Sequence, residues 1–233
     1  MLNEAIFVSL LSFVFMLMGE LMAYYSVSLK YRYEYEAFSY GFILGVATLV
    51  LIPVGHFENS SLYVILGVLF VFLLDKYLAF CPLCKKYCEE CGVNYMQVKL
   101  LYPISFFIHT FIDGLIIAMG FIGHLGLLLY LAILLHKLPA GFVLLSPLKS
   151  IYKNPLLIGV IVSFGTVLGT IVGLLLFSNI PIKPLISISG GVFIATFLLL
   201  ASHVYEHAPE KVINPLILGF LLVGLLSLLR HHH

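Results

Sequence analysis

Two apolar stretches of the sequence carry polar side chains of the types that bind metal ions. His109 and Asp113 lie within FFIHTFIDGLIIA, and His136 lies within LAILLHKLPAGF, followed directly by Lys137. His109 and Asp113 are four residues apart, so they share one face of a helix. Two imidazoles and one carboxylate suit a divalent cation such as Zn²⁺, with water at a fourth position. The alternative is that these groups hydrogen-bond one another within the helix interface, or relay protons.

The apolar surroundings of these residues make partners necessary. A charged side chain at the centre of a bilayer costs about 2.5–3.5 kcal/mol on insertion scales. Pro139 follows His136 by three residues and removes one backbone hydrogen bond, which exposes the carbonyl of Leu135. A membrane span interrupted in this way is typical of a segment that lines a cavity or a binding site. We therefore predict a metal site formed by His109, Asp113 and His136.

The composition indicates a chain of membrane-spanning helices. Of its 233 residues, 62% are hydrophobic and 10% are charged, and the mean hydropathy is +1.12. Soluble domains carry about 25% charged residues, and a membrane span needs about 20 apolar residues. The sequence therefore predicts an all-α polytopic membrane protein with a single transmembrane domain, residues 1–230. The eight expected spans are 3–28, 37–56, 61–80, 99–121, 125–147, 155–178, 184–206 and 212–230.

The charges between the spans predict an orientation. Nine lysine and arginine residues fall in loops on one side and two on the other. By the positive-inside rule the richer side faces the cytoplasm, which places both termini outside. The first apolar run has no basic segment and no cleavage site before Tyr24, so we expect a retained span. We therefore expect a multi-pass protein of a prokaryotic plasma membrane. Residues 231–233 resemble the remnant of an affinity tag.

Two further patterns concern contacts between spans. GFILGVATLVLIPVGHFE, in the second span, is similar to GGVFIATFLLLASHVYE, in the seventh. These spans cross the membrane in opposite directions, as the inverted repeats of secondary transporters do. Gly165, Gly169 and Gly173 recur at four-residue spacing in the sixth span. Such a ladder lets another helix approach closely.

Polar residues at the ends of two spans are candidates for the path of an ion. His56 and Glu58 lie just beyond the second span on the expected outer side, where they either collect cations or are ordinary interfacial residues. His203, Glu206 and His207 lie at the expected cytoplasmic end of the seventh span. The two histidines are four residues apart and share a helical face. This second cluster is the better candidate for releasing an ion.

The loop after the third span, residues 81–98, is rich in cysteine. Its sequence CPLCKKYCEEC contains Cys81, Cys84, Cys88 and Cys91. Two C-x₂-C units favour coordination of Zn²⁺ by thiolates, and a cytoplasmic loop disfavours a stable disulfide. The three residues between the units are fewer than in ordinary zinc ribbons. The loop is a candidate for an additional Zn²⁺, which would sense or buffer metal or staple the loop.

The two intramembrane motifs resemble those of a known family. HTFIDG is similar to the H-N/S-x-x-D-G motif in the fourth span of ZIP (Zrt/Irt-like) divalent-metal transporters, and HKLPAG to the H-E-x-P-x-E/G motif of their fifth span. The resemblance extends to eight spans, outer termini, the Cys/Lys-rich loop and FVFLLDK at the end of the third span. It implies a 3+2+3 bundle, with spans one to three and six to eight as inverted repeats around spans four and five. It also implies a transport bundle of spans one, four, five and six that slides past a scaffold.

The resemblance assigns roles to individual residues. His109, Asp113 and His136 match the primary transport site of the family. Typical relatives hold a second metal ion with an Asn after the first His, a Glu after the second, and a later carboxylate or His. In this sequence those positions hold Thr110, Lys137 and Ala140. The binuclear centre of typical relatives is therefore not expected here.

Lys137 carries the main departure from the family pattern. The HK-x-PA pattern is similar to the subgroup typified by the ninth mammalian ZIP. We predict that the ammonium of Lys137 replaces the second metal beside Asp113, because burial penalises a carboxylate that has lost its cation. This leaves a single-metal site. The alternatives are that Lys137 snorkels to the interface or faces a water-filled cavity, or that a neutral Lys137 is a fourth ligand.

The function expected from these features is transport of Zn²⁺, or a similar divalent transition metal, into the cytoplasm, with the ion as substrate. One alternative is a membrane sensor that binds metal without net transport, and another is an intramembrane zinc hydrolase. No H-E-x-x-H motif is present and Ala140 stands where a second acid is expected, so we predict that the protein is not an enzyme. The expected partners are the metal ion and the lipid bilayer, with a homodimer as a candidate assembly. The sequence has no basic stripe of the kind that would indicate nucleic-acid binding.

Overall fold

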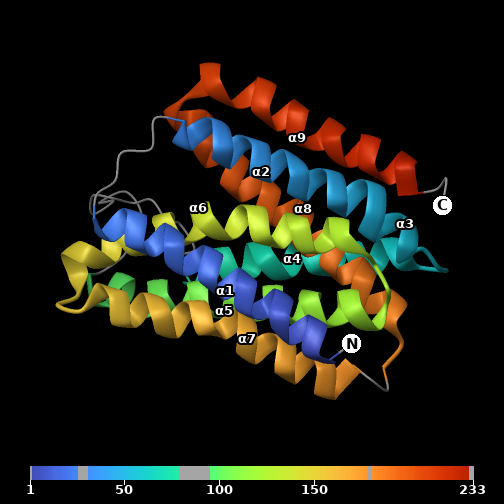
Figure 1. Cartoon of the computed structure of the whole chain (residues 1–233), viewed down its shortest axis with the longest axis horizontal. Coiled ribbons are helices and arrows are strands. Elements are labelled where there is room, and N and C mark those ends of the chain that lie inside the picture. The colour runs from blue at the N-terminus through green and yellow to red at the C-terminus, as the bar shows by residue number, and fades with distance from the viewer. Residues whose placement is uncertain (1, 26–30, 79–94, 178–179, 231–233) are drawn as a thin grey trace.

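The structure, a computed structural model, describes residues 2–25, 31–78, 95–177 and 180–230, and every regular element within them is helical. Long apolar runs form helices because a helix satisfies its backbone hydrogen bonds internally, as a bilayer requires. The predicted all-α polytopic architecture is confirmed (Figure 1). The elements are α1 Leu2–Tyr24, α2 Arg32–Val46, η1 Ala47–Leu51, α3 Ile52–Val54, α4 Ser60–Leu78, α5 Tyr95–Ile122, α6 Leu127–Ile151, α7 Pro155–Leu176, α8 Ile182–His207 and α9 Pro209–Arg230.

Seven helical segments in the described part of the chain are long and apolar enough to cross a membrane. One of them, Tyr33–Val54, runs continuously through α2, the π-helical turn η1 and α3. The helix at the place of the third expected span is α4, whose apolar part, Ser60–Leu74, is shorter than the other seven. Leucines such as Leu218, Leu221 and Leu225 of α9 are exposed on the outside of the molecule. Such side chains suit contact with lipid.

The contacts between helices divide them into two groups of four in the described part of the chain. In the first group, α5 lies along α7, and α1 lies against both α6 and α7. In the second group, α2 lies along α9 and α4 lies along α8. Figure 1 shows α2 and α9 above, α1, α5 and α7 below, and α6 between them. This division corresponds to the transport bundle and the scaffold that the family resemblance implied.

Paired glycines hold the helices of the first group close together. At the α1–α6 crossing, a Cβ atom on Gly19 would lie 2.0 Å from the carbonyl oxygen of Leu138. A Cβ atom on Gly141 would likewise lie 2.0 Å from the carbonyl oxygen of Met16. Any side chain at either glycine would therefore collide with the backbone of the opposite helix. Small residues are what allow membrane helices to approach this closely.

The α5–α7 crossing repeats this arrangement. A Cβ atom on Gly114 would lie 2.1 Å from the carbonyl oxygen of Thr166, and one on Gly169 would lie 2.0 Å from that of Phe111. Gly169 belongs to the glycine ladder, so the predicted close approach is confirmed and the partner is α5. The helices α1 and α6 are spans one and five, and the helices α7 and α5 are spans six and four. The second crossing therefore has the form of the first, with span six in place of span one and span four in place of span five. Inverted repeats produce this kind of pattern.

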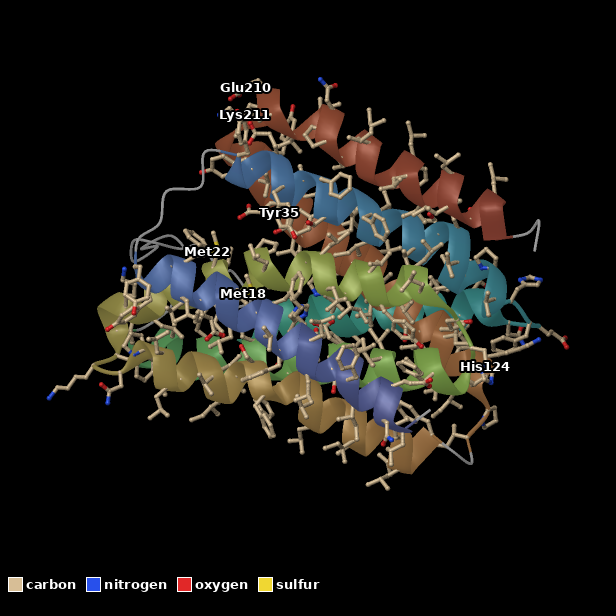
Figure 2. The ribbon with its side chains drawn as sticks, viewed as in Figure 1. Met18, Met22, Tyr35, His124, Glu210 and Lys211 are labelled. Carbon is tan, nitrogen blue, oxygen red and sulfur yellow. The ribbon has the colours of Figure 1, made fainter. Side chains whose placement is uncertain are left out.

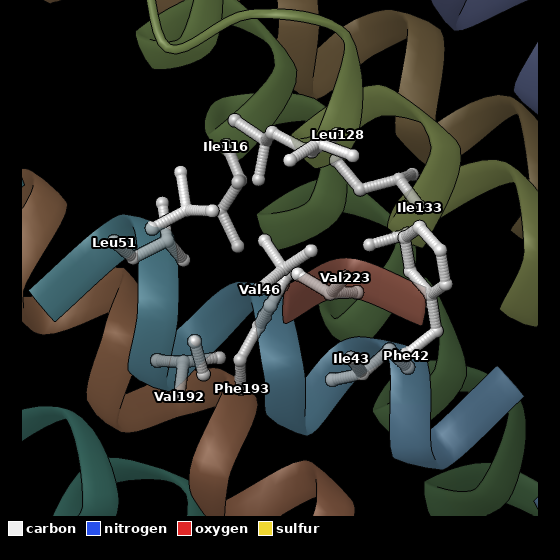
Figure 3. Packing of buried hydrophobic residues seen from close by; sticks show 14 of the residues in the cluster. Phe42, Ile43, Val46, Leu51, Ile116, Leu128, Ile133, Val192, Phe193 and Val223 are labelled. Atoms are coloured by element: carbon white, nitrogen blue, oxygen red, sulfur yellow. The ribbon is translucent and has the colours of Figure 1, made fainter. Parts of the chain in front are cut away.

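A buried apolar cluster joins the two groups of helices. Figure 3 shows Phe42, Ile43 and Val46 of α2 beside Ile133 of α6 and Phe193 of α8. Between membrane helices, association depends on van der Waals contact and close fit, because lipid tails are as apolar as the side chains. The boundary between the groups is therefore a surface of close apolar contact, crossed at a few places by polar groups.

Candidate metal centre

The structure brings His109, Asp113 and His136 together between α5 and α6. Nε2 of His109 lies 3.4 Å from Oδ2 of Asp113, and Nε2 of His136 lies 3.3 Å from the same oxygen. One candidate ligand atom from each of the three residues lies within 4.8 Å of the others. The Asp113 and His136 side chains are buried, and that of His109 is 13% exposed. The cluster therefore has the composition and spacing to hold one divalent cation, and its His109 member is not fully buried.

The backbone orients His136 for this role. Its Nδ1 lies 2.9 Å from the carbonyl oxygen of Ala132, one helical turn earlier. Because a carbonyl only accepts, Nδ1 carries the proton, and in the neutral ring the lone pair is on Nε2. That lone pair faces the Asp113 carboxylate, which is also an acceptor. A cation between the two atoms would be attracted to both of them, and metal-binding histidines are commonly held by such a second hydrogen bond.

Lys137 is part of the same cluster. Its Nζ lies 2.7 Å from Oδ2 of Asp113 and donates a hydrogen bond of 3.0 Å to Oγ1 of Thr166. The side chain is completely buried, so it neither snorkels to an interface nor faces open solvent. Three nitrogen atoms thus converge on one carboxylate oxygen. The ammonium supplies the charge that a buried carboxylate requires.

The other two residues at the family's second-site positions lie differently. Oγ1 of Thr110 donates toward α7, where it lies 2.7 Å from the carbonyl oxygen of Val162. It therefore faces away from Asp113, although Thr110 directly follows His109 in the chain. Ala140 has no side-chain donor or acceptor. Neither residue therefore offers a ligand for a second metal ion beside Asp113.

Sequence reasoning did not single out Thr166, which accepts the hydrogen bond from Lys137. It lies on α7, 29 residues further along the chain. The one available signal was its position between Gly165 and Gly169, because a hydroxyl inside a close-contact ladder faces the neighbouring helices.

The backbone carbonyl that Pro139 leaves without a helical donor accepts hydrogen bonds from side chains of α2. The carbonyl oxygen of Leu135, which has no helical donor at position 139, accepts a hydrogen bond of 2.9 Å from the Tyr35 hydroxyl (Figure 2 labels Tyr35). Ser39 Oγ also lies within 3.3 Å of the same oxygen. Tyr35 and Ser39 belong to α2, in the second group of helices. The exposed carbonyl predicted from the sequence is therefore satisfied across the boundary between the groups.

Two of the remaining candidate residues, His56 and Glu58, are not part of this cluster. His56 and Glu58 are exposed in the turn between α3 and α4. Within the described residues, neither belongs to a group of three or more metal-ligand side chains. The others cannot be placed: His203, Glu206 and His207 lie in the last turns of α8, where the structure does not describe their side chains, and Cys81, Cys84, Cys88 and Cys91 lie outside the described residues.

These observations define a class of protein: a polytopic helical membrane protein whose interior holds a cluster of metal-ligand side chains. A family profile described as ZIP Zinc transporter matches residues 85–229, which is more than half of the chain. The chain is also 61% identical, over 229 residues and 98% of each sequence, to a protein of Methanocaldococcus jannaschii described as uncharacterized. The chain belongs to the ZIP zinc transporter family. The match is to the family as a whole, so the likeness to the ninth mammalian subgroup stays an interpretation of the HK-x-PA pattern.

Proposed function

We propose that this protein moves Zn²⁺, or a similar divalent transition metal, into the cytoplasm through a single-metal site formed by His109, Asp113 and His136. The observation that carries the proposal is the convergence of three ligand atoms within 4.8 Å inside a membrane-spanning bundle. The expected direction follows from the excess of basic residues in the loops assigned to the cytoplasm.

The surroundings of Asp113 favour one metal ion over two. The ammonium of Lys137 occupies one side of the carboxylate, 2.7 Å from Oδ2. A second ion there would meet a like charge at close range and would find no further ligands, since Thr110 faces Val162 and Ala140 has none to offer. Because its ammonium is covalently attached to α6, Lys137 keeps a positive charge near Asp113, which disfavours a second ion.

The helix grouping suggests how the site is exposed alternately. Both α5 and α6 belong to the first group, which meets the second group across the apolar cluster. Movement of one group past the other would carry the whole site, as the family resemblance implies. On this proposal His56 and Glu58 would collect the ion outside, and His203, Glu206 and His207 would accept it on the cytoplasmic side. The additional Zn²⁺ on the cysteine loop stays a prediction.

Uptake of ⁶⁵Zn²⁺ into liposomes tests the proposal. We expect wild-type protein to accumulate zinc well beyond binding stoichiometry, and both His109→Ala and His136→Ala to abolish accumulation. A matched control is His124→Asn, since His124 is exposed in the α5–α6 turn (Figure 2) and Asn tolerates its positive φ of 51°. Saturation at one ion per protein without accumulation would overturn transport and favour the sensor alternative.

A further inference from the structure

A second buried carboxylate lies outside the proposed metal centre. Glu20, on α1, is completely buried, and its Oε1 accepts a hydrogen bond from Oγ of Ser163 on α7. Its Oε2 has no hydrogen-bond partner among the described residues. Gly159 makes room for that oxygen, since a Cβ atom there would lie 2.5 Å from it. A buried carboxylate without full compensation is costly, so a cation that came close to Glu20 would be stabilised there.

The nearby charge is Lys137. Its ammonium and the Glu20 carboxylate are both hydrogen-bonded to hydroxyls of α7, the ammonium to Thr166 and the carboxylate to Ser163. Ser163 and Thr166 are three residues apart, on one face of α7. The first donates to Glu20 and the second accepts from Lys137, so α7 places one hydroxyl beside each end of this charge pair.

A metal ion on Asp113 would change the surroundings of the ammonium. Nζ of Lys137 lies 2.7 Å from Oδ2, the oxygen that also faces both histidines. A zinc ion bound to that oxygen, at about 2.0–2.2 Å, would take up its negative charge and repel the ammonium. The empty site balances one carboxylate with one ammonium, and the ion adds two positive charges. The ammonium then needs another anion within reach of its flexible side chain.

We propose that Glu20 is that anion: the ammonium of Lys137 pairs with Asp113 when the site is empty and with Glu20 when a divalent cation occupies Asp113. The inference rests on the proposed function, because it assumes that the ion binds at His109, Asp113 and His136. Glu20 is then a positioning residue, which acts on the ion through Lys137. Thr166 and Ser163 lie on one face of α7, the first beside Lys137 and the second beside Glu20.

If Glu20 acts through Lys137, the effect of replacing Glu20 should depend on whether Lys137 is present. A purely structural role would not show this dependence. Glu20→Gln keeps the shape of the side chain and an oxygen that can accept from Ser163, but it removes the charge. If Glu20 serves as the alternative partner, the substitution leaves the ammonium on Asp113, where it competes with the metal. In a Lys137→Met background no ammonium competes, so the same substitution should matter little.

The experiment is a double-mutant cycle on the zinc dissociation constant of purified protein in detergent. Glu20→Gln should weaken zinc binding about tenfold in the wild-type background, a coupling typical of residues in one network, and by less than about threefold in the Lys137→Met background. The control is Glu210→Gln, which removes an exposed carboxylate from α9 (Figure 2). No effect in the wild-type background, or an equal effect in both backgrounds, would overturn the inference.

Two further variants keep the outcome interpretable. Should Glu20→Gln fail to fold, Glu20→Asp retains the charge with a shorter reach. The zinc-induced infrared difference spectrum of that variant should then show a change in the carboxylate band of the substituted side chain, and its absence would count against the inference. His136→Ala tests the metal site separately. If it leaves zinc binding intact, the proposed function fails; if it abolishes binding while Glu20→Gln does not alter binding, only the role of Glu20 fails.

Discussion

Replacing Lys137 by methionine tests how the buried carboxylate of Asp113 is neutralised. Methionine keeps most of the length of the side chain and removes its charge. Asp113 would lose its 2.7 Å ammonium partner but keep His109 and His136 at 3.4 and 3.3 Å. Removing one member of a buried ion pair typically costs 3–5 kcal/mol. Because two imidazoles remain and can donate when protonated, we expect a loss near the lower end, about 3 kcal/mol of unfolding free energy without metal.

Zinc should reverse much of this loss. Once an ion sits on Asp113, the missing ammonium no longer leaves the carboxylate uncompensated. Binding at a zinc concentration of about one hundred times the dissociation constant contributes about 2.7 kcal/mol to the folded state. Lys137→Met should therefore gain more stability from zinc than wild type does, because no ammonium competes for Asp113.

The assay is unfolding by SDS in mixed micelles, followed by circular dichroism, with a chelator or with zinc. Lys211→Met is a matched control, because Lys211 is exposed near the start of α9 (Figure 2). Equal stability of Lys137→Met and wild type without metal would refute the pairing of Lys137 with Asp113. Metal stoichiometry of Lys137→Glu is a complementary measurement: a new carboxylate beside Asp113 should add a second ion, and a stoichiometry that stays at one would contradict the role of Lys137 as its replacement.

Two other predictions concern the helix contacts. Tyr35→Phe removes the hydroxyl that donates to Leu135 across the boundary between the groups, so it should cost about 0.5–1.5 kcal/mol of unfolding free energy and alter the rate of zinc uptake; unchanged stability and uptake would show that Ser39 suffices. Gly19→Ala places a Cβ atom 2.0 Å from the Leu138 carbonyl oxygen, so it should destabilise the α1–α6 crossing by at least about 1–3 kcal/mol in the same SDS unfolding assay. Gly224→Ala, whose Cβ atom would meet only a Leu49 methyl carbon at 3.7 Å, should be tolerated, and a loss as large as that for Gly19→Ala would contradict the contact argument.

The sequence predicted the helical, polytopic fold because that information is local. Each apolar run is long enough to require a helix, and the four-residue spacing of His109 and Asp113 places them on one face whatever the rest of the chain does. His136 was predicted as the third member of the site from the family resemblance and from its depth in the next span. The second-site positions were also identified in that way, but not the direction in which Thr110 points.

What the sequence could not show depends on contacts between distant helices. Thr166 meets Lys137 across 29 residues, and Ser163 meets Glu20 across 143. No periodicity or spacing links such pairs. Local pattern does not show whether Glu20 is exposed or buried; it is buried against α7, where Gly159 and Ser163 leave space for a carboxylate. Helix contacts, and not local pattern, decide which polar groups face one another.

The hydrogen bond from Tyr35 to the Leu135 carbonyl has a consequence for the timing of movement. That carbonyl belongs to the peptide unit that continues into His136, so one rigid plane is shared by the boundary and the candidate metal centre. If the first group of helices moves along α2, this carbonyl loses its donor in surroundings where water is scarce. At intermediate positions of the helix group, the Leu135 carbonyl is an unsatisfied acceptor. Only positions at which α2 offers a new donor are low in free energy. The geometry favours movement in discrete steps, with the free-energy barrier at the peptide that joins Leu135 to the proposed ligand His136.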